Sequence, residues 1–290
     1  MVANGNEAGA GAIVELGEDE DVAALLEQQE TAAQIMVTRP TQGTAVVTLN
    51  RPDQRNAITF AMWHELADIF DQLAEDESLR SIILTGAGGY FCAGADIKEF
   101  ATVRATQEGA EEYARRVDRC TEAIAECTKA TFAAVSGPAY GGGCGLAVAC
   151  DFRICDETAV FAIPAARLSI VYGIEETRAL YEVVGLTAAK DMLFSGRARD
   201  ASEALAMGLV SEVSTEDALS AARRRAEALE TVAPLSIAGS KLVLEALTKG
   251  ETAERAERIA VATARATGSE DYREGRTAFV EKRAPRFKGR

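Results

Sequence analysis

Two glycine-rich loops, each entered directly from a short apolar run, restrict the folds open to this chain most strongly. The first loop is TGAGGYFCAGADIKEF (85–100), which follows SIILTG (81–86), and the second is VSGPAYGGGCGL (135–146), which follows TFAAVSG (131–137). A short apolar run that ends in glycine is typical of a buried parallel strand. Glycine lets the backbone approach a ligand, and free N–H groups at a helix start attract negative oxygen. The loops are therefore either plain tight turns or a pair that donates one N–H each to a single carbonyl oxygen.

Hydrophobic periodicity predicts an α/β chain whose strands lie mainly in the N-terminal part. Two strands are expected at 35–38 and 44–50. The helix that Thr59 caps then separates the second of these from the strand at 81–86, as in a βαβ unit. The other expected elements are a helix near 106–127, a small-residue helix near 142–150, strands at 152–156 and 159–163, and helices at 175–184, 187–194, 201–207, 216–231, 235–247, 251–266 and 269–282.

The chain is acidic, with a net charge of −14 over 290 residues. An acidic protein has no long-range attraction for phosphate backbones, so nucleic acid is not expected as a partner. Residues 1–33 are rich in Gly, Ala and Glu, and they predict a disordered acidic extension, with a few docked turns as the alternative. No apolar run reaches the ~18–20 residues of a membrane helix, and no secretory signal is visible. We therefore expect a cytoplasmic protein without a membrane partner.

Cysteine and histidine usage predicts no metal site. The only histidine is His64, and the six cysteines include no C-x2-C pair. Reduced thiols in a cytoplasmic protein are the simplest interpretation.

In these two loops and in three further segments, the sequence resembles the enoyl-CoA hydratase/isomerase, or crotonase, superfamily. The resemblance covers roughly residues 34–290, and it rests on five blocks in family order rather than on one short motif. The blocks are NRPDQRNAI (50–58), LTGAGGYFCAGADIKEF (84–100), VSGPAYGGGCGLAVACDFRIC (135–155), SGRARDASEALAMGLVSEV (195–213) and FVEKRAPRFKGR (279–290).

The resemblance implies a crotonase-like spiral of ββα units with a C-terminal helical trimerisation region. It implies a core with the acyl-CoA site over 34–215, and a helical oligomerisation region with a CoA-covering tail over 216–290. The expected assembly is a homotrimer, or a hexamer built as a dimer of trimers. The expected substrate is a CoA thioester, so coenzyme A is part of the substrate and no cofactor is permanently bound.

The shared chemistry of the superfamily is stabilisation of a thioester enolate by two backbone N–H groups. Carried over by motif, these belong to Ala95 in AGAD and to Gly142, the middle glycine of GGG, which agrees with the pairing of the two loops. A solvated surface charge is the alternative for each Lys and Arg that matches a CoA-binding position. The positions that the resemblance implies for CoA binding are Arg55, Ala93, Asp96, Ile97, Lys98, Phe279 and Lys282.

Both glutamates that hydratases of this superfamily use are missing. The first follows the glycine run, where this chain has Gly145, and the second lies four residues after Phe161, where this chain has Ala165. Neither side chain can transfer a proton or orient a water, so we expect very weak hydration of crotonyl-CoA. Ordinary isomerisation is in doubt too, because single-glutamate isomerases keep the second carboxylate.

The segment ARLSIVYGIEETRAL (166–180) offers substitute groups. Tyr172 falls where methylmalonyl-CoA decarboxylases of the superfamily carry a functional tyrosine, and its alternative role is simple packing. Glu175 and Glu176 are either a favourable charge pair at a helix start or a relocated acid/base, with Glu175 taken as the catalytic candidate. The loop around 100–107 and the helix at 109–127 are expected to shape the acyl pocket.

The sequence thus predicts a lyase or isomerase that works through a stabilised thioester enolate. Decarboxylation and a variant isomerisation stand ahead of hydrolysis and residual hydration. The alternative is a non-catalytic acyl-CoA binder or structural homologue that kept the fold and lost the acids. RNA binding has precedent in the superfamily, but the charge of −14 disfavours it.

Overall fold

The structure is a computed structural model that describes residues 33–290, so the predicted acidic extension lies outside the described part except for its last residue. Its main sheet has six strands in the order β1-β2-β3-β4-β6-β9. The strands are β1 (Ile35–Thr38), β2 (Thr44–Leu49), β3 (Ser81–Gly86), β4 (Ala130–Val135), β6 (Phe152–Asp156) and β9 (Glu212–Ser214). β1 runs antiparallel to β2, and every other pair in this sheet is parallel.

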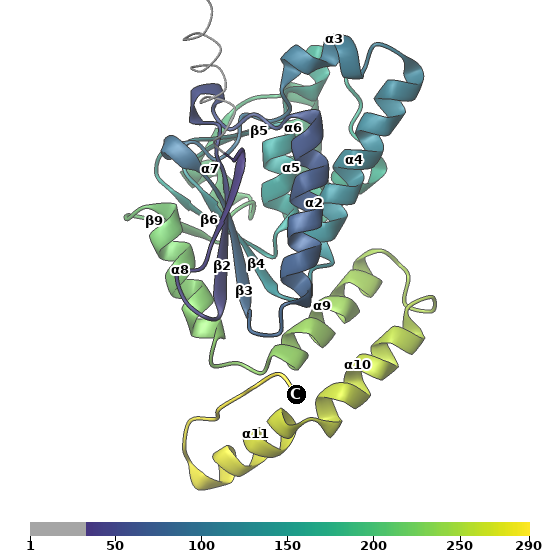
Figure 1. Ribbon diagram of the computed structural model, residues 1–290. Coiled ribbons are helices and arrows are strands. Elements are labelled where there is room, and N and C mark those ends of the chain that lie inside the picture. Colours follow the sequence, from purple (N-terminus) through teal and green to yellow (C-terminus); the bar gives the residue numbers. More distant parts are fainter. Residues whose placement is uncertain (1–32) are drawn as a thin grey trace, which may run out of the picture. The chain divides into compact units, whose positions relative to one another are not determined.

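Helices cover both faces of this sheet (Figure 1). On one face lie α2 (Phe60–Glu75), α4 (Gln107–Ala125) and α5 (Gly142–Ala149), and on the other lies α8 (Ala218–Leu229). Successive strand residues alternate between the two cores, so β3 and β4 are almost entirely buried, as expected of strands covered on both faces. α8 packs with four buried alanines, which let the helix approach the sheet closely.

A second, three-stranded sheet begins within the second glycine-rich loop. It contains β5 (Pro138–Tyr140), β7 (Val160–Ala162) and β8 (Arg199–Asp200). The sequence analysis did not anticipate β5, β8 or β9, which are only two or three residues long. Around this sheet lie η4 (Pro164–Leu168), α6 (Ile174–Ser195) and α7 (Ala201–Ala206), and Gly185 interrupts α6 between the two helices that periodicity predicted.

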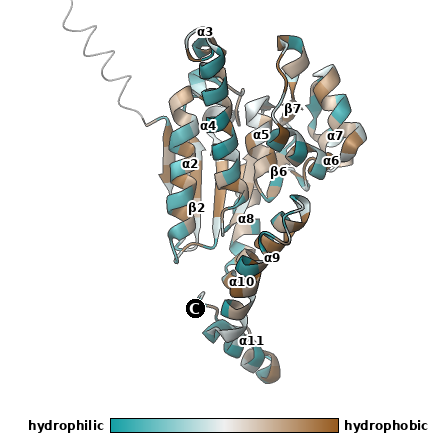
Figure 2. Ribbon diagram, turned by 90° about the vertical axis from the view of Figure 1, so that its right-hand side faces the viewer, coloured by the Kyte–Doolittle hydropathy of each residue, from teal (hydrophilic) through white to brown (hydrophobic). Residues whose placement is uncertain are grey.

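The C-terminal part consists of α9 (Pro234–Thr248), α10 (Ala256–Gly268) and α11 (Glu270–Glu281). This confirms a strand-rich part followed by a helical one, although the helix expected from residue 251 begins at Ala256. Hydrophobic residues lie along these helices in Figure 2, and Leu247, Val261 and Phe279 are more than half exposed. The ββα spiral, the boundary at 215 and the trimer remain predictions.

The described residues contain neither a membrane-spanning helix nor a metal-binding cluster. No helix within 33–290 has both the length and the apolar content needed to cross a bilayer. No group of three or more His, Cys, Asp or Glu side chains in that range is arranged to hold a metal ion.

Candidate active site

Backbone bridges hold the two glycine-rich loops side by side. The Cys92 N–H donates to the Pro138 carbonyl, and the Tyr140 N–H donates to the Cys92 carbonyl, each over 2.9 Å. The first loop is also tied to the segment before α2, because the Ile58 N–H donates to the Gly94 carbonyl over 2.8 Å. The loops therefore meet at the end of the sheet where β3 and β4 finish (Figure 1).

Glycine is required where the loops touch. Gly94 has a φ of +96°, and a Cβ on it would lie 2.6 Å from the Tyr140 carbonyl oxygen. A Cβ on Gly143 would lie 2.4 Å from the Cys92 carbonyl oxygen. Any larger residue at either position would push the two backbones apart.

The amide N–H groups of Ala95 and Gly142 lie at this contact. Gly142 is the first residue of α5, and no hydrogen bond among residues 33–290 uses either amide as its donor. The Ala95 nitrogen lies 3.8 Å from the point that a Cβ on Gly142 would occupy. Two unpaired amides at a helix start are able to donate to a single anionic oxygen.

Both residues line a mostly apolar cavity of about 390 Å³. The Trp63 ring closes one side of it, and a Cβ on Gly142 would come within 2.9 Å of that ring. The Trp63 indole N–H donates to the Tyr113 hydroxyl over 2.8 Å, which fixes both rings. The charged residues that line the cavity are Arg104, Asp118 and Glu176.

Glu176 reaches the cavity from the first turn of α6. Its Oε1 lies 3.6 Å from the point that a Cβ on Gly145 would occupy. Burial, with a further contribution from the Asp118 charge, raises the pKa of Glu176 to about 7, although the Gly173 amide and Arg104 act to lower that pKa. A carboxyl group with such a pKa is able both to accept and to donate a proton near neutral pH.

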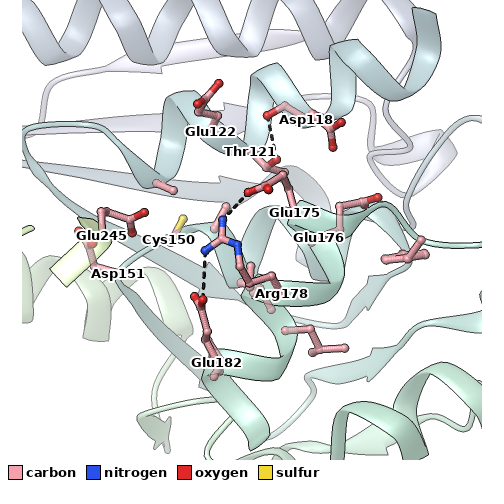
Figure 3. Close-up of a pocket in the computed structure, with 18 of the residues that line it drawn as sticks. Asp118, Thr121, Glu122, Cys150, Asp151, Glu175, Glu176, Arg178, Glu182 and Glu245 are labelled. Carbon is pink, nitrogen blue, oxygen red and sulfur yellow. Dashed lines mark hydrogen bonds and ion pairs between the residues drawn. The ribbon is translucent and has the colours of Figure 1, made fainter. Parts of the chain in front are cut away.

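Glu175, the catalytic candidate from the sequence, lies in different surroundings. Its side chain is 52% exposed and forms an ion pair with Arg178, which also bonds Glu182 over 3.0 Å. Figure 3 shows this pair in a second cavity of about 270 Å³, with Glu176 apart from it. Glu175 does not line the cavity of Ala95 and Gly142, whereas Glu176 lines both cavities.

Asp118 on α4 is a further carboxylate that the sequence analysis did not single out. Its Oδ1 and the Oε2 of Glu176 lie 3.6 and 3.8 Å from one point, the Cβ position of Gly173. Burial, together with Glu175 and Glu122, raises the pKa of Asp118. Two carboxyl groups thus approach the cavity from α4 and α6.

Tyr172, the remaining catalytic candidate, also lies at the site, and so do the two positions where hydratases have glutamates. Tyr172 lines both cavities, and its hydroxyl lies 3.6 Å from the Cβ position of Gly141. Burial raises the pKa of Tyr172 well above 10, so the phenol stays protonated. Gly145 lines the second cavity and Ala165 the first, and neither side chain can transfer a proton.

Some of the predicted CoA-binding residues lie at the mouth of the site. Ala93 and Ile97 line the first cavity, and Asp96 accepts two hydrogen bonds of 3.1 Å from Arg51. The other two of this group are exposed: Lys98 follows in η3 (Ile97–Glu99), and Arg55 stacks over the Tyr90 ring, 5.9 Å from its centroid.

Within one chain, the structure does not bring the tail residues to this site. Phe279 is 86% exposed on α11 and lines a separate pocket with Tyr272 and Phe287. Lys282 directly follows α11, and Figure 1 shows α11 away from α5.

The fold and this pair of loops define an α/β protein of the crotonase type. The family model for enoyl-CoA hydratase/isomerase matches residues 39–290. The Mycobacterium tuberculosis protein named "Probable enoyl-CoA hydratase echA8" is 34% identical over 257 residues, which are 87% of this chain and 97% of that protein. The chain belongs to the enoyl-CoA hydratase/isomerase family.

Solved structures of enoyl-CoA hydratases have the same fold as this chain. An enoyl-CoA hydratase/carnithine racemase from Magnetospirillum magneticum matches with a TM-score of 0.81 and 34% identity, covering 90% of this chain and 97% of that one. An enoyl-CoA hydratase from Bacillus anthracis matches with a TM-score of 0.80 and 31% identity, covering 89% of this chain and 100% of that one.

Proposed function

We propose that this protein is an acyl-CoA enzyme that forms a thioester enolate at the amides of Ala95 and Gly142. Membership of the family supports a CoA thioester as substrate, and so do relatives named as enoyl-CoA hydratases. Two unpaired amides in an apolar cavity support the enolate, because fixed dipoles stabilise developing charge strongly where water is excluded. Asp96, Ile97 and Lys98 lead from these amides toward the surface, where we place the CoA moiety.

Glu176 is the group that moves the proton. The observation that carries this assignment is its carboxylate, which reaches from α6 to the space beside Gly145. Glu176 takes a proton from the α-carbon as the enolate forms, and then returns it to another carbon of the acyl group. One carboxylate that moves a proton between two carbons supports isomerisation of an unsaturated acyl-CoA better than hydration. Glu176 therefore replaces Glu175 as our proposed acid/base.

Decarboxylation is the second candidate, and Tyr172 favours it. Loss of carbon dioxide gives the same enolate without a base, so the empty positions at Gly145 and Ala165 do not oppose it. A proton donor is still needed afterwards, and the protonated Tyr172 hydroxyl lies in the cavity.

The assembly belongs to the same proposal. We infer a homotrimer or hexamer in which Phe279 and Lys282 contact the CoA bound to a second copy, since they lie outside the cavity of their own chain. We also propose a cytoplasmic location, which the six buried free cysteines support.

A panel of crotonyl-, 3-enoyl-, methylmalonyl- and β-ketoacyl-CoA thioesters, followed by chromatography and mass spectrometry, tests the reaction. Isomerisation leaves the mass unchanged and moves the double bond, decarboxylation removes the mass of carbon dioxide, and hydration adds the mass of water. We expect a new isomer from the 3-enoyl thioester and very little hydration. If CoA raises the melting temperature but no thioester is converted, the protein is a binder and the enzymatic proposal fails.

A further inference from the structure

Arg104 is the one cation among the residues that line the first cavity, the one that contains the amides of Ala95 and Gly142. All of these residues belong to the described part of the chain. It follows α3 (Phe100–Val103), and its side chain is half-buried. Within residues 33–290, no carboxylate lies within ion-pair distance of its guanidinium. Its contacts are the rings of Phe100 and Tyr113, whose centroids lie 4.7 and 5.3 Å from Cζ.

A second arginine, on α4, shows that an arginine stacked on a ring can also have a carboxylate partner. Arg116 stacks over Phe60, 3.8 Å from the centroid, and is also paired with Glu112 over 3.0 Å. Arg104 stacks over two rings but forms no ion pair with a carboxylate of the described residues. Among the described residues the guanidinium of Arg104 has no hydrogen-bond acceptor, so its five donors are open to water or to a ligand.

The position of Arg104 is on the acyl side of the cavity. The Tyr113 ring beneath it is bonded to Trp63, and Trp63 packs against Gly142. The candidates for CoA contact, Arg55 and Lys98, are exposed instead. A group that reaches Arg104 from the two amides therefore belongs to the acyl chain rather than to the phosphates of CoA.

We propose that Arg104 binds a carboxylate at the far end of the acyl group, so that the substrates are CoA monothioesters of dicarboxylic acids. This inference rests on the proposed function, because it takes the thioester to lie at Ala95 and Gly142. The planar guanidinium matches a carboxylate with two parallel hydrogen bonds. The rings of Phe100 and Tyr113 hold the guanidinium in place before the ligand arrives, which reduces the entropy lost on binding.

Burial reduces the repulsion that the two acidic groups of the cavity would exert on such an anion, because it favours their neutral forms. Glu176 and Asp118 both have raised pKa values, and for each the main cause is burial. The neutral form of Glu176 is thus available near neutral pH.

Binding of saturated thioesters tests the inference without any need for turnover. Calorimetry of the full-length protein with glutaryl-CoA and with valeryl-CoA, whose acyl chains have the same length, compares a charged end with a neutral one. We expect the wild-type protein to bind glutaryl-CoA about 10- to 100-fold more tightly, as a charged hydrogen-bonded pair allows. Arg104→Gln should remove this preference, and Arg104→Lys should keep part of it.

Arg115→Gln is the matched control. Arg115 lies on α4, is paired with Glu112 and does not line the cavity, so this variant should keep the full preference. The inference is overturned if the wild-type protein shows no preference, if Arg104→Gln keeps the preference, or if Arg104→Gln weakens binding of CoA alone by the same factor. Failure of CoA itself to bind the wild-type protein would overturn the proposed function as well. A wild-type protein that shows the glutaryl preference but turns over no thioester would contradict the reaction alone.

Discussion

Glu175 and Glu176 are adjacent in sequence, yet their carboxylates have different partners. One residue turns the side chain by about 100° around the helix, which takes Glu175 to Arg178 and Glu176 to the cavity. The sequence predicts that a carboxylate lies at this helix start, but not which one enters the cavity, since that depends on how α6 is rotated against α4 and α5.

The sequence does not single out Asp118, for a similar reason. The apolar spacing of α4 predicts its buried face, and Tyr113 and Val117 are indeed buried there. It does not predict which polar residue at the edge of that face meets another element.

The capping role of Thr59 could be predicted, because a helix cap depends on local structure only. A hydrogen bond of 3.2 Å from the Met62 N–H to the Thr59 hydroxyl confirms it.

Replacing Asp118 by Asn should shift the pH dependence of the reaction. As the base, Glu176 must be ionised, so activity falls as the pH drops through its pKa of about 7. The Asp118 charge raises that pKa, and its removal should lower it. We expect the acidic limb of the profile of kcat/KM against pH to move to lower pH in Asp118→Asn. A limb that stays in place or moves to higher pH would contradict the coupling of the two carboxyl groups.

At the scale of elements, most helices and strands follow from periodicity, and the short strands do not. β5, β8 and β9 have two or three residues each, too few for an alternating pattern to appear. β5 nevertheless matters for the site, because the Cys92–Ala139 bridge uses it to hold the two loops together. The two glycine-rich loops could be predicted from the sequence, because glycine marks the positions where one backbone approaches another closely.

The C-terminal tail depends on one buried side chain of α11. The Asp271 carboxylate accepts hydrogen bonds from the N–H groups of Lys288 and Gly289 over 2.6 and 2.7 Å. Asp271→Ala removes both acceptors and should weaken tail docking by roughly 1–3 kcal/mol. Hydrogen exchange over residues 284–290 should accelerate accordingly.

Glu270→Ala provides the control for the tail. Glu270 is the exposed neighbour of Asp271 and pairs with Arg290 over 3.6 Å, and exposed pairs contribute little. Equal exchange rates in the two variants would refute the role given to Asp271.

For the whole molecule, the exposed apolar residues of α9, α10 and α11 support the predicted oligomer. Leu247 is 61% exposed and Val261 63%, and a face of this kind is typical of an interface. Leu247→Asp should reduce the mass measured by light scattering toward that of one chain, because a charge is costly to bury in an apolar contact.

Glu77→Gln, an exposed change in the loop after α2, should leave the assembly intact. A wild-type protein that is monomeric at all concentrations would contradict the predicted trimer or hexamer.

Exchange of the α-proton with solvent deuterium tests the central claim most directly, since it detects removal of that proton by Glu176 as the enolate forms. A 3-enoyl-CoA, whose α-carbon carries acidic protons, is incubated with the protein in deuterated buffer, and the deuterium in its acyl group is measured by mass spectrometry. We predict rapid incorporation with the wild-type protein and with Glu175→Gln, and a loss of about 10²–10⁴-fold with Glu176→Gln. Undiminished exchange in a correctly folded Glu176→Gln protein, or none with wild-type protein that binds the thioester, would contradict the account.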